Sequence, residues 1–148
     1  YNCVIRADVN RIVIGARSNI QDGSVIHCDG PDAHRPKGYP TLIGDDVLVG
    51  HMVMLHGCTL ADRAFVGLSS TVMNGCVIES DGMLAAGAIL SPGKAIGSQE
   101  LWMGRPAKYA RELTDEAIVD MQAGVARYVE NGRLHAQALA AAEGHGAG

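Results

Sequence analysis

Aliphatic residues recur with a period of six along the first two-thirds of this chain. The repeating positions hold Ile, Val or Leu throughout: Ile14, Ile20, Ile26, Ile43, Val49, Leu55, Leu60, Val66, Val72, Ile78, Leu84 and Leu90. A small residue usually stands two positions earlier, such as Ser24 or Ala88. A period of six fits neither the 3.6-residue turn of an α-helix nor the two-residue alternation of a β-strand. It is typical of a β-helix, in which short parallel strands wrap around a narrow prism.

Three hexapeptides make one coil of such a prism, so residues eighteen positions apart stack in adjacent coils. Cys58 and Cys76 have this separation, and both occupy the small inward position. The four cysteines show no CxxC spacing, and that spacing is the usual sign of a structural zinc knot. We therefore predict packed structural thiols and no catalytic role for Cys28.

Two histidines are brought into register if residues 29–40 leave the prism as a loop. His27 and His56 then each follow an aliphatic position on the same face, in adjacent coils. Neighbouring parallel strands lie about 4.8 Å apart, which is close enough for two imidazoles to share a metal ion. His51 lies about one corner of the prism away, so it cannot easily join them within one chain. A second subunit can supply its own His51, and closure of this contact on a three-sided prism predicts a homotrimer.

Composition narrows the class of protein further. The 148 residues are 47% hydrophobic, 19% charged and only 4% aromatic, and they include 19 glycines, which suits one domain with a thin aliphatic core and frequent turns. The formal net charge of −4 leaves no basic face, so we expect no binding to nucleic acid or to an acidic membrane surface. The sequence shows neither a membrane-spanning apolar run nor a signal sequence at its start, so we expect a cytoplasmic protein, with an organelle matrix as the alternative.

The carboxyl-terminal third follows a different pattern. The ladder is expected to end at Leu90, and the segment "LWMGRPAK" (101–108) to cross out of the prism. Thr114 is a predicted N-cap, followed by an apolar stripe at helical spacing: Ile118, Met121, Val125, Tyr128 and Val129. We thus expect a β-helix over 1–101, lacking its first coil, and a crossover and α-helix over 102–148 with a mobile tail, "EGHGAG".

Several segments together resemble the gamma-class carbonic anhydrases and their hexapeptide-repeat relatives. They are "VIRADVN" (4–10), "SNIQDGSVIH" (18–27), "IGDDVLVGHMVMLHGC" (43–58) and "GRPAK" (104–108). The resemblance implies an all-β fold, a left-handed parallel β-helix of hexapeptide repeats with a C-terminal α-helix. It also implies a trimeric enzyme that hydrates carbon dioxide to bicarbonate with zinc, or with Co²⁺ or Fe²⁺.

Carried over by position, the resemblance assigns a role to each candidate residue. His27, His51 and His56 become ligands of a metal ion at a subunit interface. Arg6 and Asp8 resemble a pair that acts across that interface, with Asp22 assisting. Gln21 resembles the amide that orients the metal-bound water or bicarbonate, and Tyr128 is the candidate for a tyrosine that approaches the site. Catalytic roles thus fall on Gln21, Arg6 and Tyr128.

Two departures from the family pattern bear on activity. Val9 replaces the carboxylate expected after Asp8, and the long acidic loop that carries protons is reduced to "CDGPDAHRPKGYP" (28–40). Asp29, Asp32 and His34 are the remaining candidates for proton transfer, so we expect turnover to be low, buffer-dependent or absent. Two alternatives stay open: a hexapeptide acyltransferase that uses a lone histidine as base, and a non-catalytic assembly or regulatory subunit.

Overall fold

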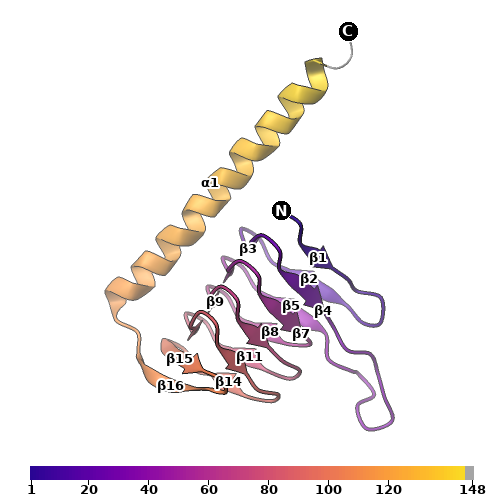
Figure 1. Ribbon diagram of the computed structural model, residues 1–148, viewed down its shortest axis with the longest axis vertical. Helices are drawn as coiled ribbons and strands as arrows, with labels where there is room; N and C mark the ends of the chain where they lie inside the picture. Colours follow the sequence, from indigo (N-terminus) through magenta and orange to yellow (C-terminus); the bar gives the residue numbers. More distant parts are fainter. Residues whose placement is uncertain (146–148) are drawn as a thin grey trace.

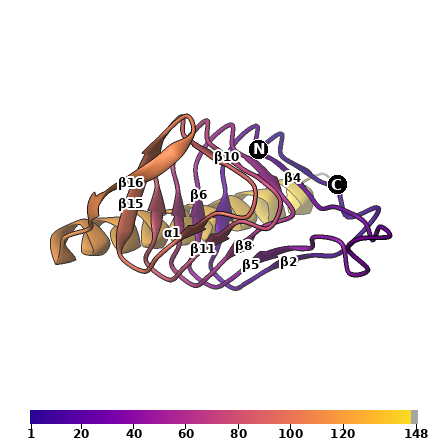
Figure 2. The ribbon, with the colours of Figure 1, turned by 90° about the horizontal axis from the view of Figure 1, so that it is seen from below.

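The structure, a computed structural model, describes the backbone of residues 1–145 and the side chains of residues 1–142. Its strands form three parallel faces that close into a triangular prism (Figure 2). Successive coils stack along the prism, and one long helix runs beside them (Figure 1). The expected fold, a left-handed parallel β-helix followed by a C-terminal α-helix, is confirmed.

Each coil contributes one strand to each of the three faces, which we name after one of their strands. The β4 face contains β1 (Val4–Ile5), β4 (Val25–His27), β7 (Met54–His56), β10 (Thr71–Val72) and β13 (Ile89–Leu90). The β5 face contains β2 (Ile12–Ile14), β5 (Thr41–Ile43), β8 (Thr59–Leu60), β11 (Val77–Ile78) and β14 (Ala95–Ile96). The β6 face contains β3 (Asn19–Ile20), β6 (Leu48–Val49), β9 (Phe65–Val66), β12 (Met83–Leu84), β15 (Glu100–Gly104) and the antiparallel β16 (Ala107–Glu112).

The interior of the prism is built from the aliphatic ladder. From Ile26 to Leu90, the side chains at the predicted positions are at most 3% exposed. Ile14 lies in the outermost coil and is 37% exposed, since no further coil covers it on that side. A buried aliphatic side chain of this size contributes about 1.5–3 kcal/mol to folding. The repeat therefore supplies most of the driving force for stacking the coils.

The ladder continues beyond Leu90, contrary to the sequence-based expectation. Ile96 is fully buried and pairs with Ile78, while Trp102 pairs with Leu84 and packs against the core. Both residues keep the period of six, but Lys94 stands where a small residue is expected. Lys94 is exposed at the end of the prism, where the small-residue requirement no longer applies. The proposed boundary between residues 101 and 102 stays a prediction.

The long helix α1 (Asp115–His145) packs along the β6 face. The Thr114 hydroxyl accepts a hydrogen bond from the amide of Ala117 at 3.2 Å, so the predicted N-cap is confirmed. Ile118, Met121 and Val125 are buried, whereas Val129 is 39% exposed. The expected mobile tail at 143–148 begins in the last turn of α1 and otherwise lies outside the described residues. Among the described residues, no helix combines the length and apolar character that a membrane span needs.

Residues 29–40 leave the prism as a closed loop, as expected. The amide of Asp29 donates to the carbonyl of Tyr39, and the amide of Tyr39 donates back, both at 2.9 Å. The side-chain amide of Asn10 donates to the carbonyls of Asp29 and Lys37 at 2.8 and 2.9 Å. These bonds fix the base of the loop beside the end of β4.

The thiols of Cys58 and Cys76 are buried in adjacent coils and form no disulfide. Burial raises the pKa of Cys58 to about 12. At pH 8 only about one molecule in ten thousand then carries the reactive thiolate at this position. We expect iodoacetamide to leave Cys58 unmodified in the folded protein and to modify it fully in denaturant, as read by peptide mass spectrometry. Native labelling of Cys58 at the rate of a free thiol would contradict this assignment.

Candidate metal centre

The strand pairing brings His27 and His56 together at the ends of β4 and β7. The two residues are direct partners in the parallel register, as the period of the ladder predicted. The Nδ1 atom of His27 lies 3.0 Å from Nε2 of His56, and the His27 side chain is 17% exposed. Two imidazole nitrogens therefore face each other at the edge of the β4 face.

The outer nitrogen of each imidazole in this pair has its own partner. Nε2 of His27 lies 2.8 Å from Oδ1 of Asp8, and the other oxygen of Asp8 accepts from the guanidinium of Arg6. These hydrogen bonds, first from His27 and then from Arg6, hold the pKa of Asp8 below its usual range. Nδ1 of His56 lies 2.5 Å from Oδ1 of Asn74. Both rings are thus oriented by hydrogen-bond acceptors on their outer sides.

This arrangement fits a metal ion between the two rings. Ligand nitrogens around tetrahedral zinc, at bond lengths of about 2.0–2.1 Å, lie roughly 3.3 Å apart. The observed separation of 3.0 Å is close to that value. With an ion between them, both rings would be neutral, and each would donate its remaining N–H, His27 to Asp8 and His56 to Asn74. All four ring nitrogens then have a partner.

A glycine makes this close packing possible. Gly57 follows His56 directly and has a φ of +58°, which L-residues with a side chain rarely adopt. A Cβ atom at this position would stand 2.6 Å from Cβ of Tyr39 and 2.7 Å from Oδ1 of Asn74.

His51 belongs to a separate group of side chains. It lies in the turn between β6 and β7, and its Nδ1 atom is 3.0 Å from Oδ2 of Asp22. The hydroxyl of Tyr128, on α1, is 3.5 Å from Nε2 of His51. Gln21 is 7% exposed and donates through Nε2 to Asn19 at 3.1 Å. His51, Asp22, Gln21 and Tyr128 line a cavity of about 450 Å³ between the β-helix and α1.

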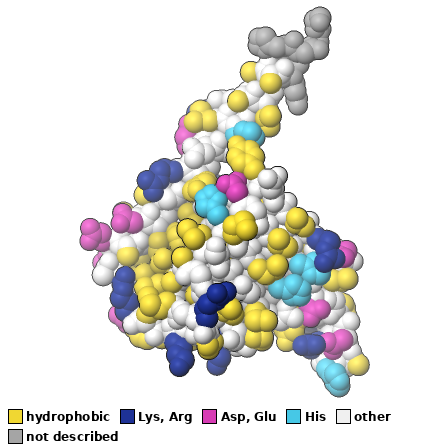
Figure 3. Space-filling view, in the orientation of Figure 1, with side chains coloured by type: hydrophobic (Ala, Val, Ile, Leu, Met, Phe, Trp, Pro, Cys, Tyr) yellow, Lys and Arg dark blue, Asp and Glu magenta, His cyan; other side chains and the backbone are white. Residues whose placement is uncertain are grey.

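The two histidine groups do not meet within one chain. His51 lies in the turn that precedes β7, whereas His56 is the last residue of that strand. No group of three or more His, Cys, Asp or Glu side chains in the described part of the chain could hold a metal ion. Figure 3 shows histidine surfaces at separate places on the visible face of the molecule. One chain therefore presents two incomplete halves of the predicted site.

Asn74 is the residue of this centre that sequence reasoning missed. It follows the aliphatic position Val72 by two residues, in the coil next to His56. The only sequence signal is a polar residue in the turn after a strand of the β4 face, and such residues are common in turns. Its contact with His56 depends on side-chain direction across coils, which the period of the ladder does not specify.

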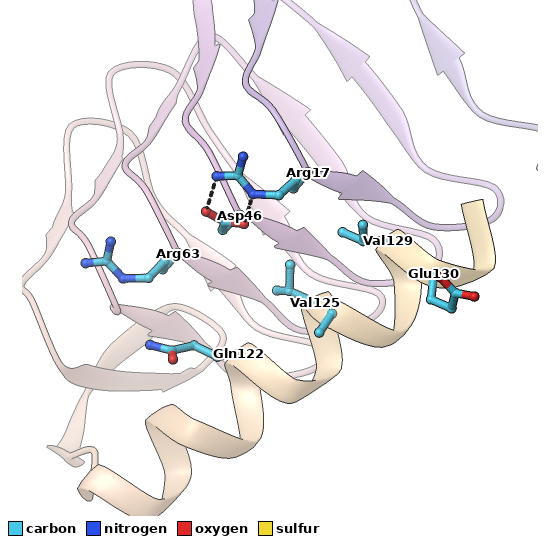
Figure 4. Close-up of a pocket in the computed structure, with 8 residues that line it drawn as sticks. Arg17, Asp46, Arg63, Gln122, Val125, Val129 and Glu130 are labelled. Carbon is cyan, nitrogen blue, oxygen red and sulfur yellow. Dashed lines mark hydrogen bonds and ion pairs between the residues drawn. The ribbon is translucent and has the colours of Figure 1, made fainter. Parts of the chain in front are cut away.

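A second cavity, of about 400 Å³, lies between α1 and the corner turns of the prism (Figure 4). Its charged lining is already paired: Arg17 binds Asp46 through two hydrogen bonds of 2.7 Å. Arg63 binds Asp81 through two hydrogen bonds of 2.9 Å. Histidine is absent from the described residues that line this cavity. This cavity therefore lies apart from the histidines of the predicted site.

Comparison with curated proteins identifies relatives along most of the chain. It is 44% identical over 136 residues to gamma carbonic anhydrase 2, mitochondrial, of Arabidopsis thaliana, which covers 92% of this chain and 49% of the plant protein. It is 38% identical over 135 residues to a carbonic anhydrase of Geobacillus kaustophilus, covering 91% of this chain and 70% of that protein. The chain thus spans about half the length of the plant relative. No family model matches the chain.

Solved structures agree with this relationship. A hexapeptide transferase family protein from Anaplasma phagocytophilum superposes with a TM-score of 0.82 at 43% sequence identity, covering 90% of this chain and 74% of that one. The shared coils, the register of His27 with His56 and the sequence identity all indicate the same family. This chain belongs to the gamma-class carbonic anhydrase family of hexapeptide-repeat proteins.

Proposed function

We propose that the assembled protein catalyses the reversible hydration of carbon dioxide to bicarbonate. The site is a metal centre shared between subunits of a homotrimer. His27 and His56 of one subunit and His51 of the partner subunit bind the ion, which is zinc, with Co²⁺ or Fe²⁺ as alternatives. Support comes from the family relationship and from the two complementary halves of the site on each chain.

The single observation that carries this proposal is the facing pair of imidazole nitrogens in adjacent coils. Nδ1 of His27 and Nε2 of His56 face each other at 3.0 Å. The other ring nitrogen of His27 contacts Asp8, and the other ring nitrogen of His56 contacts Asn74. Asp22 engages Nδ1 of His51 in the same way, so Nε2 of His51, which lies 3.5 Å from the Tyr128 hydroxyl, is the atom that would bind the ion. Three neutral imidazoles with one remaining position is the ligand set of a catalytic zinc site.

Each further residue has a role given by the half of the site to which it belongs. Gln21 and Tyr128 lie on the His51 side, so they reach the shared ion together with His51 of the partner subunit. The Gln21 amide orients the attacking water or the bicarbonate product, and the Tyr128 hydroxyl contacts the same position. Arg6 and Asp8 lie on the His27 side and orient that ligand. In the trimer, Arg6 and Asp8 also pair across the interface, with Asp22 assisting.

The metal ion, when bound, would supply an acidified water whose pKa falls towards about 7. The protein then has to orient this nucleophile and to carry away one proton in each turnover. Asp32 is badly suited to carry that proton. The Arg35 guanidinium, 2.5 Å from Asp32, holds the pKa of this carboxyl below its usual range and keeps it ionised at neutral pH. With Val9 also lacking a proton-carrying group, we expect turnover to be low and to depend on an external buffer.

Two measurements on the purified assembly test this proposal. Metal analysis is expected to find about one ion per chain. Stopped-flow measurements are expected to detect hydration of carbon dioxide that accelerates as the buffer concentration rises. If the metal-loaded trimer hydrates carbon dioxide no faster than buffer alone, the proposed enzymatic activity is contradicted. It would favour the non-catalytic assembly subunit instead.

The hexapeptide acyltransferase remains the alternative from another class of enzyme. It is favoured by one observation, the superposition with a solved protein named as a hexapeptide transferase family member. An acyltransferase needs one histidine base and no metal, so its activity towards an acyl-coenzyme A would survive removal of metal by a chelator.

The proposed location is the cytoplasm, although the plant relative is named as mitochondrial.

A further inference from the structure

We propose that Asp29 and Asn74 are positioning residues that fix the proton of His56 on Nδ1 and thereby direct its Nε2 lone pair at the metal. This inference rests on the proposed metal centre and adds two residues to it. Asp29 then acts through the orientation of an amide group, in contrast to a role as a carrier of protons.

The direction of the chain of hydrogen bonds is set at Asp29. An ionised carboxylate only accepts hydrogen bonds, whereas the side-chain amide of Asn74 has one donating and one accepting end. Asn74 donates through Nδ2 to Oδ2 of Asp29 at 2.8 Å. If the amide were turned over, two acceptor oxygens would face each other. Asp29 therefore determines that Oδ1 of Asn74 points the other way, towards His56.

The orientation of Asn74 in turn determines the tautomer of His56. Oδ1 of Asn74 lies 2.5 Å from Nδ1 of His56, so this nitrogen must carry the proton and donate it. A neutral imidazole has one N–H and one lone pair, which leaves the lone pair on Nε2. That atom is the one that faces His27, at 3.0 Å. The chain of two hydrogen bonds thus selects the tautomer that can bind a metal ion at this point.

The surroundings hold both residues in place. Asp29 stands at the closed base of the 29–40 loop, where it exchanges two backbone hydrogen bonds with Tyr39. Oδ1 of Asn74 lies over Gly57, where a Cβ atom would approach to within 2.7 Å. The backbone hydrogen bonds fix the main chain from which the Asp29 side chain reaches Asn74, and Asn74 is held between Asp29 and His56 by its own two hydrogen bonds. Groups that orient a metal-binding histidine typically change metal affinity by 10- to 100-fold when they are removed.

A double-mutant cycle on the assembled protein tests the inference, with the zinc dissociation constant as its readout. Asn74→Ala is expected to weaken zinc binding about 10- to 100-fold. Asp29→Asn is expected to weaken it less, because an amide in place of the carboxylate tolerates both orientations of Asn74.

The cycle is completed by measuring Asp29→Asn in an Asn74→Asp background, where its expected effect on zinc binding has the opposite sign. There the native Asp29 faces a second carboxylate and repels it, whereas the amide introduced by Asp29→Asn can donate a hydrogen bond to it. Asp29→Asn should therefore tighten zinc binding in this background. An effect of Asp29→Asn that is the same in both backgrounds would overturn the inference.

A second readout needs no metal. The ¹⁵N chemical shifts of His56 in the metal-free protein are expected to report the Nδ1–H form in the wild type and its loss in Asn74→Ala. Asn10→Ala is the matched control, because it loosens the same loop without touching His56. An unchanged tautomer in Asn74→Ala, or an equal loss in Asn10→Ala, would overturn the inference. If zinc binds and the double-mutant cycle behaves as expected, but carbon dioxide is not hydrated, the result counts against the proposed function and leaves this inference intact.

Discussion

Substitution of His56 by alanine is expected to abolish zinc binding and to reduce hydration of carbon dioxide to the uncatalysed rate. His56 supplies one ligand atom directly and is also the residue against which His27 is oriented, at 3.0 Å. Its loss leaves one imidazole on that side of the shared site. Because removal of a group that only orients a ligand costs 10- to 100-fold, the loss of the ligand itself should exceed about 100-fold in affinity.

The measurement is metal content after dialysis, together with the shift of the thermal midpoint on adding zinc. Ligand bound at about 100 times its dissociation constant stabilises a folded protein by about 2.7 kcal/mol, so the wild type should show a clear shift and His56→Ala none. His34→Ala is the matched control, since His34 lies in the exposed loop and binds Asp32 only through its backbone amide. Retention of stoichiometric zinc in His56→Ala would rule out the proposed ligand set.

Mixing two inactive variants is expected to restore activity, which is the second large effect. His51→Ala and His56→Ala damage opposite halves of the shared site. In randomly mixed trimers, a site is intact when its His27 and His56 come from a His51→Ala chain and its His51 comes from a His56→Ala chain. This combination occurs at about a quarter of the interfaces, so about a quarter of the wild-type activity should return.

The control for this experiment combines two lesions in the same half. His27→Ala mixed with His56→Ala leaves no interface with both strand-end histidines intact, so no activity should return. If the first mixture also stays inactive, a site shared between subunits is excluded. Co-expression with two different affinity tags allows the mixed trimers to be purified and counted.

The sequence predicted a large part of this molecule correctly because burial repeats at a fixed interval. A ladder of aliphatic residues every six positions is sufficient to place Ile43 beside Ile14, Val49 beside Ile20 and Leu55 beside Ile26, as the strand register confirms. The same register places His27 beside His56. The expected end of the ladder at Leu90 was wrong, because Ile96 pairs with Ile78 and Trp102 pairs with Leu84.

What the sequence by itself determined, therefore, is the set of coils and the pairing of the two strand-end histidines. The resemblance had already named Asp8, Asp22 and Tyr128, but only the tertiary structure decided which histidine each of them contacts. Asp8 lies against His27, and Asp22 and Tyr128 lie against His51. The tertiary structure also added Asn74, which lies against His56. The physical reason lies in the two kinds of interaction. Apolar burial has no direction and follows the chain period, whereas a hydrogen bond depends on where side chains from different coils, loops and a helix point.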